Sequence, residues 1–166
     1  HHVLAPGDLR DNARLIARIR AGLPTRTQYT GLVANLYTDL LINDRLQRSA
    51  KLDMAAIYRK LRSTAPTPDN VWILYMRIYE VLWELQSGTL VTPTSNGHIR
   101  FDAGLGAKVI RVYSKDWLKG AARFAALILP YLLERPEQKS MQAVFCHGSI
   151  QMGPERASRS RTAWSR

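Results

Sequence analysis

The stretch from residue 69 to residue 88, DNVWILYMRIYEVLWELQSG, most constrains what this chain can fold into. Two prolines just before it disfavour a helix there, and Asp69 is a good N-cap because its carboxylate accepts backbone N–H groups. Gly88 can adopt the left-handed conformation that ends many helices. Apolar residues recur at helical spacing between these limits, so the sequence predicts a helix over residues 69–87.

Two neighbouring apolar stripes run along this predicted helix. The first stripe consists of Val71, Leu74, Tyr75, Ile78, Val81, Leu82 and Leu85. The second stripe consists of Trp72, Met76, Tyr79 and Trp83. A helix that is apolar on nearly all sides is buried on most of them. We therefore expect the central helix of a small domain, with the second stripe as an interface to a further element or to a partner chain.

The charge balance points to a polyanionic partner. The chain of 166 residues has a net charge of +11, from 24 Lys and Arg against 13 Asp and Glu. Each phosphate that a basic side chain neutralises releases counterions, which favours binding to nucleic acid. An anionic membrane surface or an acidic protein is the alternative class of partner.

Two further observations bear on where the protein acts. No apolar run approaches the ~18 residues of a membrane span, so we expect no membrane-spanning segment and no membrane as the main partner. The single cysteine, Cys146, forms no intramolecular disulfide and fits a reducing compartment. We therefore expect an intracellular protein, in the cytoplasm or associated with the nucleoid.

Periodicity and capping signals predict the remaining elements. Helices are expected over residues 7–22, 28–42 and 53–63 and again after Ser114, where Pro130 should kink or divide the helix. Between the central helix and the last one the pattern changes. An Asn-Gly turn signal precedes alternating residues, and the segment AGLGA contains two glycines. This pattern predicts a β-hairpin over residues 98–113.

Three helices followed by a hairpin and a closing helix resemble a winged helix-turn-helix domain in the order of their elements. The resemblance implies a mainly α fold with a small β-hairpin, its core over residues 27–135. A basic helical arm would precede this core over residues 1–26, and a basic tail would follow over residues 136–166. In that family the third helix reads the major groove. Here that helix is largely apolar, so phosphate contacts are expected from other elements.

The densest basic segment of the expected core extends from residue 45 to residue 62, with Asp53 as its one acidic residue. The hairpin expected after the central helix adds further basic residues. The candidate nucleic-acid-binding residues are therefore Arg45, Arg48, Lys51, Arg59, Lys60, Arg62, Arg100, Lys108, Arg111 and Lys115.

No pattern in the chain predicts catalysis, a metal site or a cofactor. A zinc site needs about four nitrogen or sulfur ligands, and the chain offers one cysteine and two histidines besides the leading pair. Phosphate-binding loops, nucleophile elbows and dinucleotide fingerprints are absent from the sequence. Arg77, Glu80 and Glu84 are interpreted as a strip of surface ion pairs on the central helix.

Two functions follow as hypotheses. The first is a non-enzymatic domain that binds nucleic acid, duplex DNA in particular, as in plasmid or phage replication, partition or transcription control. The alternative is a structural subunit of a ribonucleoprotein or chromosome-organising complex, or a homodimer. In that case the apolar central helix, through Trp72, Met76, Tyr79 and Trp83, would form the protein interface.

Overall fold

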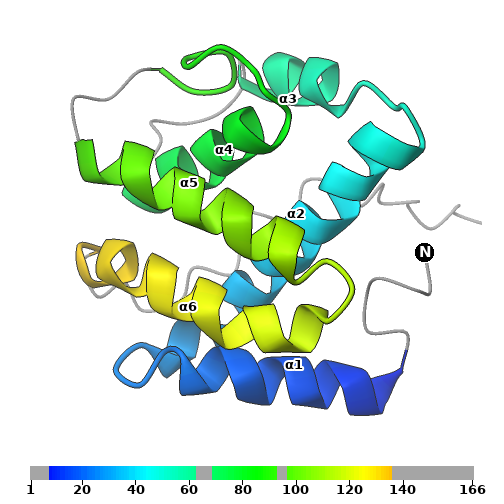
Figure 1. Ribbon diagram of the computed structural model, residues 1–166. Coiled ribbons are helices and arrows are strands. Elements are labelled where there is room, and N and C mark those ends of the chain that lie inside the picture. The colour runs from blue at the N-terminus through cyan, green and yellow to red at the C-terminus, as the bar shows by residue number, and fades with distance from the viewer. Residues whose placement is uncertain (1–7, 63–68, 93–96, 136–166) are drawn as a thin grey trace, which may run out of the picture. The chain divides into compact units, whose positions relative to one another are not determined.

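The helix predicted to be central lies at the middle of the core. In the computed structural model, which describes residues 8–62, 69–92 and 97–135, this helix is α4 (Asn70–Leu82), and it packs against α2, α5 and α6 (Figure 1). Its N-terminus is capped as predicted, because the Asp69 carboxylate accepts a hydrogen bond from the Trp72 amide at 2.8 Å. Most of its side chains are buried, which fits its two apolar stripes.

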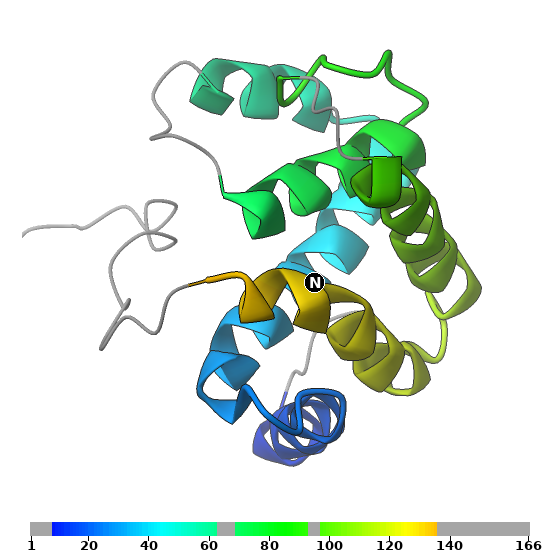
Figure 2. The same ribbon diagram turned by 90° about the vertical axis from the view of Figure 1, so that its left-hand side faces the viewer.

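The other described elements are also helical. In chain order they are α1 (Leu9–Ala21), the short 3-10 helix η1 (Thr27–Tyr29), α2 (Thr30–Ser49), α3 (Met54–Arg62), α4, α5 (Gly97–Val112) and α6 (Trp117–Leu133). Helix α5 packs against both α4 and α6, and α1 packs against α6 and α2 (Figures 1 and 2). Helix α2 continues beyond its expected end near residue 43, and α6 runs through Pro130 as one element.

The predicted β-hairpin over residues 98–113 is wrong, because this segment forms helix α5 and no strand occurs among the described residues. The buried residues of α5 recur at helical spacing; they are Ile99, Ala103, Gly106, Ala107 and Ile110. Several of them are small, which lets α5 lie close to α4. A Cβ atom at Gly106 would come within 2.6 Å of the Ile78 side chain. Gly106 therefore serves close helix packing. The winged-helix-like fold expected from the order of elements is wrong as well, because the segment expected to form the wing is a helix.

Helix α1 belongs to the core. Its residues Leu15 and Ile19 are buried, as is Leu23 just after it, and all three lie in the same apolar cluster as the central helix. The boundary expected after residue 26 therefore falls inside one packed unit. The tail expected over residues 136–166, including Cys146, lies outside the described residues.

The second apolar stripe of α4 is covered largely from within the chain. The Tyr79 ring packs at a tilt against the rings of Tyr58 of α3 and of Trp83, with ring centroids 4.9 and 4.5 Å apart. Asn43 of α2 donates hydrogen bonds to the hydroxyl groups of both tyrosines, at 2.8 and 2.9 Å. Met76 and Tyr79 are fully buried, so a second chain cannot contact them directly in this fold.

Helix α4 ends five residues earlier than predicted. It stops at Leu82, and Glu84 takes a left-handed backbone conformation with φ of 55°. The chain then turns back, so that residues 83–92 fold over the end of the helix. Gly88 lies within this loop at φ of 99°, a conformation that glycine adopts without strain.

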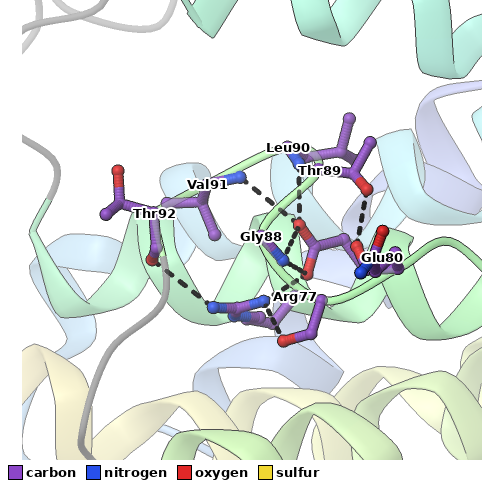
Figure 3. A network of polar contacts seen from close by, with 9 residues as sticks. Arg77, Glu80, Gly88, Thr89, Leu90, Val91 and Thr92 are labelled. Carbon is purple, nitrogen blue, oxygen red and sulfur yellow. Dashed lines mark hydrogen bonds and ion pairs between the residues drawn. The ribbon is translucent and has the colours of Figure 1, made fainter.

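The loop is held by a buried ion pair. Glu80 and Arg77 are only 3% and 7% exposed, so their interpretation as surface residues is wrong. The Glu80 carboxylate accepts hydrogen bonds from the amides of Gly88 and Leu90, at 3.2 and 2.7 Å, as well as from Arg77 (Figure 3). Arg77 also donates to the Ser87 hydroxyl at 2.6 Å. The Glu80 carboxylate therefore replaces the hydrogen bonds with water that these loop amides give up on folding.

Candidate nucleic-acid interface

The first group of candidate residues lies at the C-terminal end of α2 and on α3. Arg45, Arg48 and Lys51 are exposed, as are Arg59 and Lys60. Arg48 and Arg59 lie close to carboxylates. Arg48 lies 3.1 Å from the Asp44 carboxylate, and Arg59 lies 3.9 Å from the Asp53 carboxylate. The side chain of Arg62 lies outside the described residues.

The second group lies on α5 and after it, where a hairpin wing had been predicted. Arg100, Lys108 and Arg111 project from the exposed side of this one helix, and Lys115 lies in the connection to α6. The Arg111 guanidinium donates a hydrogen bond to the Leu82 carbonyl at 2.6 Å. This carbonyl belongs to the last turn of α4, where a positive charge is favourable because the helix dipole ends there.

A buried carboxylate brings the two groups together. Asp44 is almost completely buried on α2, and burial raises the pKa of its carboxyl group above the ordinary value of 3.8. The charges of Arg48 and Arg111 act in the opposite direction on that pKa, so both guanidinium groups lie near the same carboxyl group. One basic residue of α2 and one of α5 are thereby placed at a shared edge of the fold, which we call the α2–α5 edge.

Several candidate cations lie outside the ion pairs of the described residues. Arg45, Lys51, Arg100, Lys108 and Lys115 are exposed and form no ion pair with any described residue. Arg45 follows Asp44 directly, and Lys108 lies one helical turn before Arg111. The α2–α5 edge therefore combines the anchored side chains of Arg48 and Arg111 with the unpaired side chains of Arg45 and Lys108, and its carboxylate Asp44 is buried.

The grouping of basic residues around Asp44 was not predicted from the sequence, because the helix over residues 28–42 was expected to end before this residue. One signal was available, since Asp44 and Arg48 are spaced i, i+4 and would pair if the helix continued. The electrostatic influence of Arg111 on Asp44 had no such signal, because it depends on how two helices distant in sequence are placed.

Two further observations concern metal binding and the buried tyrosines. No cluster of three or more His, Cys, Asp or Glu side chains that could hold a metal occurs in that part of the chain. Burial raises the pKa of Tyr75 and of Tyr79 well above its ordinary value, so these phenols stay protonated at neutral pH. Their burial also prevents them from stacking on bases.

Comparisons with protein-family models, with curated proteins and with solved structures found no match for this chain. None of the helices in the described part combines the length and hydropathy that crossing a bilayer requires. Function must therefore be argued from the residues and their arrangement.

Proposed function

We propose that the protein is a non-enzymatic domain that binds the phosphate backbone of duplex DNA through the α2–α5 edge. The observation that supports this proposal is the anchoring of two cations from different helices: Arg48 pairs with the buried Asp44 carboxylate, and Arg111, whose charge also acts on that carboxyl group, is held by the Leu82 carbonyl. The two cations come from helices distant in sequence, and the unpaired Arg45 and Lys108 lie close to them along the chain. Anchored guanidinium groups lose less conformational freedom on binding than free ones.

The proposed mode of binding is electrostatic. Arginine and lysine neutralise backbone phosphates, and the release of counterions drives the association. Contacts of this kind position a protein on DNA without reading its sequence. The buried state of α4 supports the same mode, because a helix covered by other elements cannot enter the major groove. We therefore expect little sequence preference.

A second candidate function is that of a subunit in a larger assembly. Helix α3 exposes about half of the side-chain surface of Ile57 and Leu61, and Leu52 just before it is equally exposed. Trp72 of α4 and Trp83, which directly follows this helix, also keep partial exposure. In this alternative a protein partner would cover α3 and the edge of α4, and the fully buried residues of the second stripe would not take part.

The test compares two double substitutions that remove the same charge from different places. Arg45→Ala with Lys108→Ala removes two unpaired cations of the α2–α5 edge, whereas Arg10→Ala with Arg18→Ala removes two exposed cations of α1. Binding of a fluorescently labelled duplex is measured by anisotropy over a range of salt concentrations. The first variant should reduce the slope of log K against log salt by about two, at ~0.9 per phosphate.

The α1 variant should change the slope clearly less. All four positions are exposed, so far-UV circular dichroism should report an unchanged fold for both proteins. Equal losses in the two variants would mean that only the net charge matters, and the α2–α5 edge would not be a site. A wild-type protein that shows no salt-dependent binding to DNA would favour the assembly function.

A further inference from the structure

Helix α5 carries an exposed apolar stripe that phosphate binding does not use. Phe101, Leu105 and Val112 are 68%, 40% and 61% exposed. Their spacing of four and seven residues places them on one side of the helix, away from the side that packs against α4 and α6. Figure 2 shows α5 at the right-hand edge of the described helices, where none of the other described elements covers its outer side. Aligned apolar side chains of this size mark interaction surfaces more often than isolated ones do.

Two shallow hollows lie beside this stripe and share Leu105. One, of about 380 Å³, lies between α5 and α6 and is lined mainly by Val109, Val112 and Leu127. The other, of about 460 Å³, runs along Phe101 and Gly104. A Cβ atom at Gly104 would meet nothing within 4 Å, so the missing side chain helps to keep that hollow open. Ridges and hollows that alternate along a helix are the shape into which a second helix packs.

Basic side chains border the stripe and its hollows. Arg100 lines one hollow, and Lys108 and Arg123 line the other. Arg123 lies over the ring of Tyr113 at 4.9 Å, which holds its charge at the rim. Arg100 and Lys108 form no ion pair within the described part of the chain. The one carboxylate of α5, that of Asp102, accepts a hydrogen bond from the Tyr131 hydroxyl at 2.6 Å.

We propose that this face of α5 binds an acidic amphipathic helix of a partner protein. Apolar side chains of the partner would fill the hollows around Leu105, and its carboxylates would meet Arg100, Lys108 and Arg123. This is the helix-in-groove mode, with anchors on one side of the bound helix. Charge complementarity selects the occupant, because acidic flanks match a basic rim.

The same charges argue against the other occupants. A second copy of the chain would bring the same basic rim face to face with itself, and the arginine-rich segment over residues 148–166 would also be repelled. An anionic bilayer shares the required charge, but a flat membrane surface has no side chains to place in the hollows. This proposal shares Arg100 and Lys108 with the candidate DNA-binding residues, but its test does not depend on DNA binding, because it is read at the apolar residues Phe101 and Val112.

The experiment uses the full chain and a synthetic acidic helix as the probe. The peptide is about four turns long, with leucines along one side and glutamates on both flanks. One control peptide has the same composition in scrambled order, and another has lysine in place of each glutamate. Amide resonances of the ¹⁵N-labelled protein are followed by NMR during titration. We expect the acidic amphipathic peptide alone to bind and to shift the amides of α5.

Substitutions then locate the surface. Phe101→Glu and, separately, Val112→Glu should each weaken peptide binding by at least about tenfold, the range of a central anchor residue. Leu9→Glu on α1 is the matched control, because Leu9 is 88% exposed, and it should leave the affinity unchanged. Phe101→Ser and Val112→Ser provide the same test without an added charge, should either glutamate variant fail to fold.

Four results would overturn the proposal. The first is peptide binding that Phe101→Glu and Phe101→Ser leave intact, and the second is a set of shifts confined to α3. The third is binding to phosphatidylserine vesicles through α5 without binding to the peptide, which would assign the face to a membrane. The fourth is a dimer in sedimentation that Phe101→Ser dissociates, which would assign the face to a second copy.

Discussion

Arg77 and Glu80 carry opposite charges into the interior of the protein, three residues apart on the central helix. Removing two charges from water is unfavourable, and their attraction compensates for it only when hydrogen bonds satisfy the remaining polar atoms. Glu80 meets this condition through the amides of the loop over residues 83–92, and Arg77 meets it through Ser87 (Figure 3). The pair therefore fixes the path of the chain after α4 as well as its own position.

Replacing Glu80 with Gln should destabilise the protein strongly. The variant leaves Arg77 charged, buried and without its counterion, and breaking a buried pair in this way costs about 3–5 kcal/mol. Glu84→Gln is the matched control, because Glu84 is exposed, and surface changes stay within about 0.5 kcal/mol. The free energy of unfolding is measured by urea denaturation. Similar values for the two variants would show that the charge of Glu80 does not hold the loop.

At the scale of elements, the packing of α5 depends on where its small residues lie. Gly104 faces the surface, whereas Gly106 faces Ile78 of α4 and Leu127 of α6. The two glycines are only two residues apart on the same helix, so their backbone propensities are equivalent. They differ in the space that a methyl group would find.

Two alanine substitutions should therefore have effects of opposite sign. Gly104→Ala should stabilise the protein by about 1 kcal/mol, because alanine favours a helix interior and its methyl group meets nothing. Gly106→Ala should destabilise it by about 1–3 kcal/mol, because the methyl group would displace the buried side chain of Ile78. Thermal unfolding followed by circular dichroism measures both effects. Equal stabilisation by the two variants would mean that α5 does not pack closely against α4.

At the scale of the whole molecule, the Asp44 carboxyl group of α2 is influenced by a charge on α5, a helix distant from it in sequence. Burial raises the pKa of its carboxyl group in the folded state above 3.8, despite the opposing charges of Arg48 and Arg111. A raised folded-state pKa means that the folded protein is favoured while this carboxyl is protonated. That contribution is lost as the pH rises through the folded-state pKa.

The pH dependence of stability should show whether burial or the charges of the two arginines has the larger effect on the pKa of Asp44. We expect the stability of Asp44→Asn relative to wild type to increase from pH 3 to pH 7, because only the wild type must ionise a buried carboxyl group over that range. Urea denaturation at each pH measures the difference, which removes the contributions of all other titrating groups. A relative stability that falls with rising pH would show that the two arginines outweigh burial.

The sequence by itself determined the helices that carry a strong period and clear caps. The predicted helices over residues 53–63 and 7–22 correspond to α3 and α1. At the start of α1, the Asp8 carboxylate accepts a hydrogen bond from the Asp11 amide. The start of α4 at Asp69 was predicted for the same reason. Capping and periodicity depend on residues only a few positions apart, so the sequence alone is enough to predict these helices.

Tertiary structure decided what depends on neighbours distant in sequence. The segment over residues 97–112 is rich in glycine and alanine. Its small residues favour a helix here because α4 and α6 pack closely against them. Arg77 and Glu80 are polar by sequence, and they are buried because the following loop folds back over them. Desolvation and close packing depend on which surfaces the fold brings together, and the periodicity of one segment does not show which surfaces these are.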